Sequence, residues 1–486
     1  MTHPDFSISA LNGRPAVRGI RPWLMVGTAL LLSGCASFSP DGGMSMVTAT
    51  VSRDLGKEAS AQRTPDEAES ARSVTRRLLA KPLSAEAAVQ IALLNNRGLQ
   101  AAYNELAISE ARVVEASLPP NPAISLSRIA GSVEVERKIV ANVLALATLP
   151  MRSQIAADRF RQAQIIALSE TLRVAAEARR AYYRAVAARE LAGFLAEAQS
   201  GAETAAKFAT RLGETGGMNK LDQAREQVFY ADLTAQLATA RQRAASERES
   251  LIRAMGLWGG DLAFKTAAAL PPLPSRPQAL PDIETEAVRR HVDLKIGRLE
   301  LDALAKSYGL TQATRFINVL DAGLSAKTTR EKATGEKIRD RGFDVELQIP
   351  IFDFGEVRVR EAEATYMHAV NRLTERAVNV RSEARDAYRS YRSAYDITMH
   401  YQKEVLPLRK IISDETLLRY NGMLIDVFSL LAEARQRIAA TTAAIEAKRD
   451  FWLATTNLNT AVMGGGVSTR SETAVASGAS AEPAQH

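Results

Sequence analysis

The sequence predicts a mainly α-helical protein with a small β part, in which a helix, a strand pair and a long helical hairpin occur twice. The chain has 486 residues, of which 46% are hydrophobic, so it can bury a sizeable core. Proline is absent from three long tracts, residues 151–270, 282–349 and 408–482. These tracts are rich in Ala, Arg, Glu, Leu and Gln, a composition that favours long helices.

An internal repeat is the second basis for this fold class. Landmark residues of the first half recur in the same order in the second half, at a shift of 195 residues that later drifts slightly. The alternative is a chance alignment of two Ala-rich helical halves. The matched positions are Ala92 and Ala287, Leu99 and Leu294, Glu105 and Glu300, Leu106 and Leu301, Tyr182 and Tyr388, Gly217 and Gly422, and Arg225 and Arg435.

The first element, residues 1–34, is predicted to be a signal peptide. A basic stretch at residues 14–21 is followed by an apolar run at residues 23–32 and then by small residues. This is the layout of a secretory signal.

The chain's single cysteine, Cys35, stands at the end of this segment in Leu-Ser-Gly-Cys. These residues resemble the bacterial lipoprotein signal, which implies cleavage between Gly34 and Cys35, a diacylglyceryl group on the cysteine sulfur, and palmitate among the acyl chains that the cysteine carries. Two or three acyl chains hold a protein on a bilayer stably. Ala36 follows the cysteine, and the resemblance therefore implies the outer membrane. The alternative is an ordinary signal peptide followed by an incidental buried cysteine.

The rest of the chain divides into a linker, two repeats and a tail. Residues 35–82 are largely polar and are expected to form a lipidated N-terminal linker. Repeat 1 is expected at residues 83–265 and repeat 2 at residues 283–464, with a Pro-rich linker at residues 266–282 between them. The tail, residues 465–486, is rich in Ser, Ala and Gly and is expected to be disordered.

Each repeat is expected to hold one strand pair. The strands of repeat 1 are predicted at about residues 123–129 and 137–149, and those of repeat 2 at about residues 316–328 and 342–352. The signal is clearest from Phe343 to Ile349, where apolar residues alternate with Asp, Glu and Gln. Two interpretations remain open: hairpins half-buried on a soluble core, or membrane strands with one lipid-facing side.

Each repeat then continues into a long helical hairpin, at about residues 151–257 and 355–464. From Val359 onward the apolar positions of the second hairpin are spaced by three and four residues, as in a coiled-coil seam. The hairpin turns are expected at residues 213–217 and near Gly422. Pro407 interrupts the second hairpin and is expected to kink it.

Several segments together resemble the TolC-like outer-membrane efflux family, over about residues 83–464. The first is Ile-Pro-Ile-Phe-Asp-Phe-Gly at residues 349–355, which leads from a strand into a long helix. The others are Leu-Pro-Pro-Asn-Pro at residues 118–122, Asn-Lys-Leu-Asp-Gln-Ala at residues 219–224, and Tyr-Asn-Gly at residues 420–422.

The resemblance implies a homotrimer whose chains each give four strands to one twelve-stranded transmembrane β-barrel, continued by a periplasmic α-helical tunnel. An open sheet in lipid would leave unpaired backbone groups, so a four-stranded chain needs partners. The implied function is passive conduction of small molecules across the outer membrane of a Gram-negative bacterium. The implied partners are outer-membrane lipid, a periplasmic adaptor (membrane fusion protein) and an inner-membrane pump of the resistance-nodulation-division type.

The resemblance also implies where the adaptor docks. The grooves near the two hairpin tips are the expected surface, around Gly217 and Lys220 on the first tip and around Arg419 and Gly422 on the second. No cofactor is implied beyond the covalent lipid on Cys35.

The periplasmic gate is expected near the second tip. Some relatives place an aspartate nine residues after the tip glycine, and Leu431 stands there in this chain. Tyr420 and Asp426 are therefore the nearest gate candidates. A solvated, structural Asp426 is the alternative.

Enzymes and nucleic-acid-binding proteins are not supported by the sequence. The five histidines are isolated, no catalytic motif or metal-ligand spacing is present, and no catalytic or metal-binding residue is predicted. The net charge of +7 is spread over helices of mixed sign. The rival interpretation is a lipid-anchored periplasmic coiled-coil scaffold without a pore. A scaffold explains Cys35 and the seams, but not the repeated strand pairs.

Overall fold

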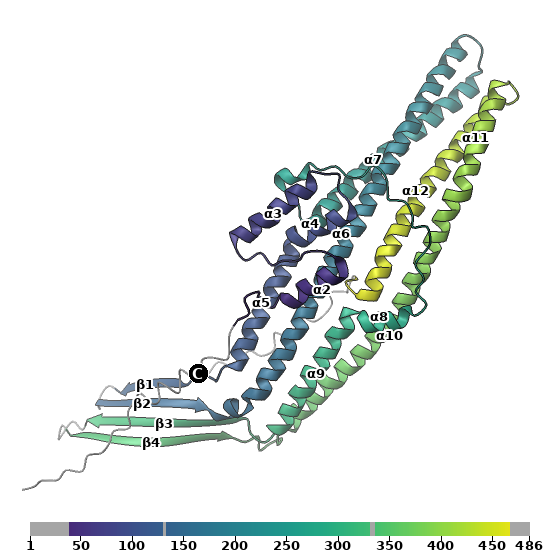
Figure 1. The fold of residues 1–486 in the computed structure, drawn as a ribbon. Helices are drawn as coiled ribbons and strands as arrows, with labels where there is room; N and C mark the ends of the chain where they lie inside the picture. Colours follow the sequence, from purple (N-terminus) through teal and green to yellow (C-terminus); the bar gives the residue numbers. More distant parts are fainter. Residues whose placement is uncertain (1–37, 130–132, 331–335, 467–486) are drawn as a thin grey trace, which may run out of the picture.

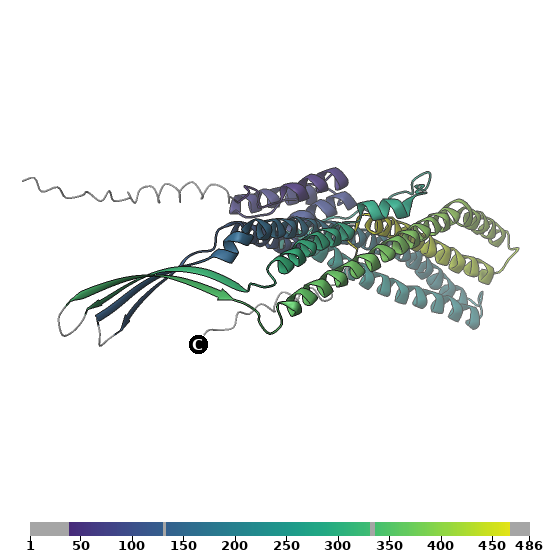
Figure 2. The same cartoon turned by 90° about the horizontal axis from the view of Figure 1, so that it is seen from below.

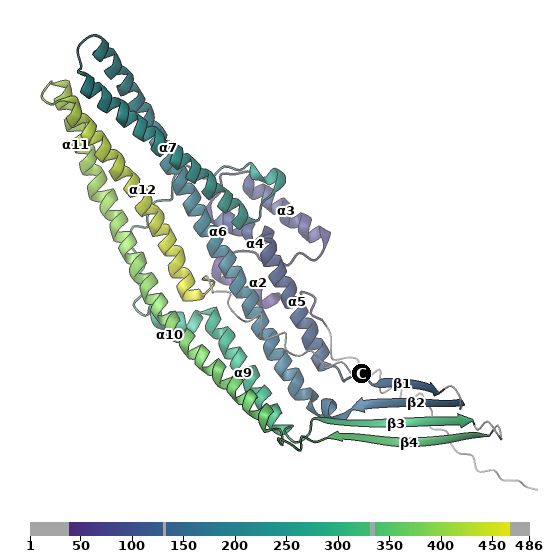
Figure 3. The same ribbon diagram turned by 180° about the vertical axis from the view of Figure 1, so that it is seen from behind.

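The computed structural model describes residues 38–129, 133–330 and 336–466. The protein is elongated: a four-stranded sheet lies at one end, and helices extend from it to two hairpin tips at the opposite end (Figure 1). The view from behind shows the two tips close together, far from the sheet (Figure 3). A mainly helical fold with a small β part is therefore confirmed.

Within the described residues, the order of helix pair, strand pair and helical hairpin occurs twice. The elements of the first half are α2 (Ser45–Leu55), α3 (Pro65–Leu79), α4 (Ala85–Asn95), α5 (Arg97–Ser117), β1 (Ala123–Ile129), β2 (Val133–Asn142), α6 (Val143–Glu214) and α7 (Lys220–Met255). The elements that follow are the 3-10 turn η1 (Gly259–Leu262), α8 (Ile283–Arg290), α9 (Val292–Ala313), β3 (Val319–Arg330), β4 (Lys337–Gln348), α10 (Glu356–His400), the π turn η2 (Tyr401–Val405), α11 (Leu406–Asn421) and α12 (Val427–Met463).

The sheet has the strand order β1-β2-β3-β4, and all neighbouring strands are antiparallel. The central pairing of β2 with β3 joins the two halves of the chain, and its register is uninterrupted from Val133 opposite Arg330 to Asn142 opposite Asp321. Among the described residues, β1 and β4 each pair on one side only. Both outer edges of the sheet therefore offer free backbone groups.

Two strands end earlier than the sequence predicts. Residues 143–149, predicted as part of a strand, form the first turns of α6 because Asn142 Oδ1 accepts the backbone N–H of Ala145 at 2.6 Å and caps that helix. This apolar run has no alternation that separates a strand from a helix. β4 ends at Gln348 because the chain turns at Pro350, whose carbonyl oxygen accepts the backbone N–H of Phe354 at 2.8 Å.

The prediction of a linker over residues 35–82 was wrong for its described part. α2 and α3 lie in this segment, and Val47 and Val51 of α2 are fully buried against α6. α3 begins with a capping box in which Thr64 and Glu67 bond each other's backbone N–H groups. One pair of valines four residues apart is too short a pattern to reveal the docked face. Cys35 and Gly34 lie outside the described residues.

α6 is the longest helix and forms the spine of the protein. It has 72 residues, which corresponds to about 108 Å at 1.5 Å per residue. Its buried side chains include many alanines, such as Ala175, Ala178 and Ala185, so neighbouring helices approach it closely. Figure 2 shows α6 and its neighbours as long, roughly aligned rods that continue away from the sheet.

A π turn precedes Pro407 in the second hairpin. Pro407 has no N–H to donate within the helix, and the backbone N–H of Leu406 bonds the carbonyl of Tyr401, five residues earlier. The extra residue in this turn accommodates the proline where the sequence predicts a kink.

None of the described helices is both long enough and apolar enough to cross a membrane.

Candidate functional site: the sheet faces and the hairpin tips

The sheet has one apolar face. Residues paired across antiparallel strands share a face, so Ile124, Ile139, Leu324 and Phe343 form one row across all four strands. Their exposed fractions are 76%, 50%, 63% and 69%. A row of large apolar side chains this exposed indicates an apolar environment or a partner that the single chain does not supply.

The predicted alternation in β4 is reproduced by this pairing. Phe343, Val345 and Leu347 share the apolar face, and their pairing partners on β3 are Leu324, Ala322 and Leu320. Every residue of β4 is exposed. β4 is therefore not half-buried on a helical core, which removes the first of the two interpretations that the sequence left open for this strand.

The opposite face is acidic. Only two basic residues lie on it within the described strands, and both form ion pairs: Lys138 with Asp344 at 3.7 Å, and Lys327 with Glu134. We call it the acidic face; its carboxylates are those of Glu134, Glu136, Asp321, Asp340, Asp344 and Glu346. An amphipathic sheet with one apolar and one charged face matches the alternation of a membrane strand.

A tight joint connects β4 to α10. Gly355 adopts a left-handed backbone with a φ of +74°, and a Cβ at this position would lie 2.1 Å from the carbonyl oxygen of Arg315. The Arg315 guanidinium donates to the carbonyl of Phe354 at 3.0 Å and pairs with Glu356 at 2.9 Å. The last residue of the sequence motif at 349–355 thus needs to be glycine for a physical reason.

The first hairpin tip holds two of the predicted docking residues. Gly217 lies in the turn between α6 and α7, and Lys220 is the first residue of α7. Asn219 caps α7, since its Oδ1 accepts the backbone N–H of Asp222 at 2.9 Å.

The second tip holds the other docking residues and both gate candidates. Arg419, on α11, pairs with Glu415 at 3.0 Å, and Gly422 closes this helix. Tyr420 lies in the last turn of α11, where its carbonyl accepts the backbone N–H of Met423.

Asp426 has a specific structural contact. Its Oδ1 accepts the backbone N–H of Ser429 at 2.9 Å and the hydroxyl of Ser429 at 2.7 Å, so it caps α12. These hydrogen bonds lower the pKa of Asp426 below its usual value of 3.8. The cap is consistent with the structural alternative for this residue, and its role as a gate stays a prediction.

Two arginines connect the hairpins near their tips, a contact that sequence reasoning did not identify. Arg225 of α7 lies over the ring of Phe428 of α12 at 4.7 Å, and Arg435 of α12 lies over Phe229 of α7 at 4.9 Å. Glu226, beside them, is only 3% exposed, and burial raises its pKa although Arg435 is close. The repeat had already paired Arg225 with Arg435, which was the one available signal.

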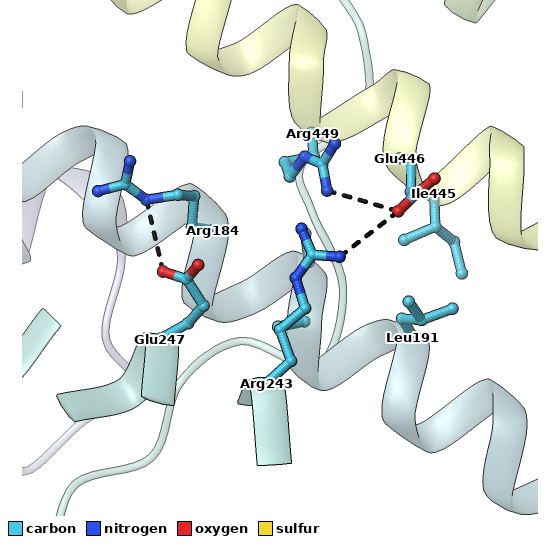
Figure 4. Close-up of a pocket in the computed structure, with 9 residues that line it drawn as sticks. Arg184, Leu191, Arg243, Glu247, Ile445, Glu446 and Arg449 are labelled. Carbon is cyan, nitrogen blue, oxygen red and sulfur yellow. Dashed lines mark ion pairs between the residues drawn. The ribbon is translucent and has the colours of Figure 1, made fainter. Parts of the chain in front are cut away.

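A second contact between the hairpins lies nearer the middle of the helices. Figure 4 shows Arg243 of α7 and Arg449 of α12 both reaching Glu446, each at 3.6 Å. Beside them, Arg184 of α6 pairs with Glu247 of α7 at 3.4 Å. The pair of Arg243 with Glu446 joins the two hairpins, whereas the pair of Arg184 with Glu247 joins the two helices of the first hairpin. Within the described part of the chain, no group of three His, Cys, Asp or Glu side chains is arranged to hold a metal ion.

The chain is similar in sequence to a known metal-resistance protein and in fold to several solved structures. No family model matches the chain. The cobalt-zinc-cadmium resistance protein CzcC of Cupriavidus metallidurans is 26% identical over 284 residues, which are 56% of this chain and 64% of CzcC. The match thus spans less than two thirds of that relative.

Solved structures cover more of the chain. The outer membrane channel CmeC of Campylobacter jejuni matches with a TM-score of 0.68 and 15% identity, over 80% of this chain and 87% of CmeC. CusC, described in terms of transmembrane channel formation, matches with a TM-score of 0.65 and 16% identity, over 78% of this chain and 92% of CusC. The open outer membrane channel MtrE of Neisseria gonorrhoeae matches with a TM-score of 0.63 and 15% identity, over 78% of this chain and 88% of MtrE. The chain therefore shares the fold of these outer-membrane channel structures, which is the fold that its sequence resemblance predicts.

Proposed function

We propose that this protein is the outer-membrane channel of a tripartite efflux system and conducts small molecules passively. The observation that carries the proposal is the sheet with an apolar and an acidic face and two outer edges. A chain that enters lipid must pair all its backbone groups, and a four-stranded sheet cannot do so alone. A homotrimer supplies twelve strands, which close a barrel without edges.

The strand lengths and the two faces support this arrangement. β2, β3 and β4 have 10, 12 and 12 residues, and a transmembrane strand needs about 9–11. In the barrel the apolar face contacts lipid, and the acidic face lines the aqueous lumen. The helices continue the lumen into the periplasm, where the tips meet an adaptor that links the channel to an inner-membrane pump of the resistance-nodulation-division type.

The acidic face favours cationic cargo. A lumen lined by carboxylates concentrates cations and repels anions. The relative CzcC is named for resistance to cobalt, zinc and cadmium. A deletion strain profiled against salts of these metals and against cationic and anionic drugs tests this cargo class.

Conductance decides between the channel and the scaffold. The full chain, purified from membranes and added to planar bilayers, is expected to give discrete conductance steps and to run as a heat-modifiable trimer. The absence of both, with a soluble coiled coil released after loss of the lipid, would instead support the scaffold.

The lipid anchor on Cys35 is compatible with the described geometry. Ser39, four residues after Cys35, donates its backbone N–H to Glu110 Oε1 at 2.7 Å. Four extended residues reach at most about 14 Å. Glu110 lies about 10 Å along α5 from Ser117, beyond which β1 begins. An acyl chain on Cys35 can therefore enter the bilayer at the helix-side end of the sheet.

Cys35→Ser is expected to abolish incorporation of labelled palmitate, because it removes the only cysteine of the chain. The precursor is expected to remain uncleaved at Gly34, which a shift in mobility on a gel detects. Label incorporated into the Cys35→Ser protein would contradict this site.

Lys220→Glu combined with Arg419→Glu is expected to reduce cross-linking to the adaptor strongly, because charge is reversed on both tips where docking is proposed. Lys410→Glu, at an exposed residue of α11 away from the tip, is the control and is expected to leave cross-linking intact. Unchanged cross-linking in the double variant would remove these two residues from the docking surface.

Asp426→Ala and Asp426→Asn separate the gate from the cap. A gate that acts through charge predicts a larger closed-state leak in both variants, measured as single-channel current. A cap predicts a defect only in Asp426→Ala, because asparagine still accepts the Ser429 N–H. The lowered pKa means that the ionised cap stabilises α12 above pH 3.8 and that this contribution is lost as the pH falls below that value.

A further inference from the structure

The basic residues of the sheet are separated from its acidic residues by face. Six cationic side chains lie on the apolar face, and within the described strands no carboxylate lies there. Both ion pairs of the described strands are on the acidic face. We call the six residues the cationic surface; they are Arg128, Arg137, Arg330, Lys337, Arg339 and Arg341.

The cationic surface occupies only one end of the apolar face. Arg341 and Arg137 share the row next to Phe343, and the other four residues lie farther from the helices. From Leu347 to Arg341 the strand advances by six residues, or about 20 Å, and side chains on this face in between are apolar. Exposed aromatic rings of Phe316, Phe352 and Phe354 mark the helix-side end of this apolar stretch.

This order matches the cross-section of a bilayer. An arginine on the lipid-facing side of a barrel is costly at the midplane and nearly free at the interface. The apolar rows therefore correspond to the hydrocarbon core, the aromatic rings to one interface, and the cationic surface to the opposite interface, on the side of the strand turns.

Within the described strands, no carboxylate forms an ion pair with a residue of the cationic surface. Arg330 and Lys337 are directly opposite each other across β3 and β4, an arrangement of like charges that destabilises a sheet unless an anion lies between them. Guanidinium groups bind phosphate through paired N–H donors, and basic clusters at this depth attract phosphate-bearing headgroups.

We propose that the cationic surface binds the phosphates of lipid A in the outer leaflet. The proposal rests on the proposed function, because only a barrel with its helices in the periplasm directs the strand turns outward. Lipid A supplies both parts of the match: acyl chains lie against the apolar rows, and phosphates meet the arginines at the interface.

The test compares two pairs of cations from opposite faces of the same strands. Arg137→Gln with Arg341→Gln removes two charges from the cationic surface, and Lys138→Gln with Lys327→Gln removes two from the acidic face. Native mass spectrometry of the detergent-purified full chain, titrated with diphosphorylated lipid A, measures the affinity.

The arginine pair is expected to weaken lipid A binding about 30-fold, which corresponds to about 2 kcal/mol for the loss of two basic residues near an anionic headgroup. The variant Lys138→Gln with Lys327→Gln is expected to bind lipid A like the wild type. Arg137→Lys with Arg341→Lys keeps both charges but loses the paired N–H donors, so its affinity is expected to lie between those of the wild type and of Arg137→Gln with Arg341→Gln. The wild type is expected to bind dephosphorylated lipid A weakly. Its affinity for that ligand should equal the affinity of the variant Arg137→Gln with Arg341→Gln for diphosphorylated lipid A.

Two results would overturn the proposal: equal lipid A affinity of the arginine pair and the wild type, or displacement of lipid A by inorganic phosphate, which would make the surface a free-phosphate site. If the arginine pair does not form the heat-modifiable trimer, Arg128→Gln with Arg339→Gln from the next row replaces it. Conductance of the wild type distinguishes failure of the lipid A proposal from failure of the proposed channel function. A conducting wild type with unaltered lipid A binding in the variants refutes only this proposal, whereas a wild type without conductance refutes the proposed function.

Discussion

Leu324→Arg is expected to prevent insertion of the protein into the outer membrane. Leu324 lies in the middle of the apolar row, paired with Ile139 on β2 and Phe343 on β4, and is 63% exposed. In the proposed barrel this position contacts lipid in the last apolar row before Arg137 and Arg341, between the bilayer midplane and the interface. The cost of an arginine there lies between about 1 kcal/mol, its value near the interface, and about 4 kcal/mol, its value at the midplane. Three chains raise this cost to about 3–12 kcal/mol per trimer, a range that reaches the whole stability of many proteins.

The matched control for this variant is the next residue. Ser325→Arg places the same side chain on the acidic face, opposite Gly342, which leaves it room. We expect this variant to insert like the wild type. The measurement is the amount of heat-modifiable trimer in the outer-membrane fraction. Equal insertion of Leu324→Arg and Ser325→Arg would show that the apolar face does not contact lipid.

Gly355→Ala is expected to disrupt the joint between the sheet and α10. Alanine in the left-handed conformation costs about 1–2 kcal/mol. The new Cβ would also lie 2.1 Å from the carbonyl oxygen of Arg315, a backbone atom that cannot rotate away. Such overpacking adds about 1–3 kcal/mol, so a total loss of about 2–5 kcal/mol is expected.

Gly216→Ala provides the comparison that isolates the clash. Gly216, in the first tip, has a φ of +76°, nearly the same as Gly355, but no neighbouring atom lies within 4 Å of the point that a Cβ would occupy. At Gly216 the only cost of alanine is that of its left-handed backbone conformation, about 1–2 kcal/mol. Hydrogen exchange of the amides around each glycine measures both losses. Equal local destabilisation in the two variants would contradict the role assigned to the Arg315 contact.

Some elements could be predicted because their signal is local. β1 is predicted at residues 123–129 and is observed there, directly after Pro122. The alternation in β4 and the glycines of the two tips are equally local. α2 was missed because its buried face amounts to Val47 and Val51, and α6 begins early because one side chain, Asn142, caps it.

The candidate site also has features that local sequence patterns predict and features that depend on long-range pairing. The apolar and the acidic face follow from alternation once a register is known, but the register itself is long-range: β2 pairs with β3 across about 190 residues of sequence, from Asn142 to Asp321 and beyond. The stacking of Arg225 on Phe428 and of Arg435 on Phe229 depends on how two hairpins lie together. No local pattern encodes such contacts.

By itself, the sequence determined the class of fold, the existence and approximate place of the strand pairs, and the family resemblance, because periodicity, proline placement and turn residues act over a few residues. The tertiary structure decided which strands are neighbours, that one face collects apolar and cationic residues while the other collects carboxylates, and that Asp426 caps a helix. These depend on pairings between distant segments, whose free energy is gained only when the whole chain has assembled.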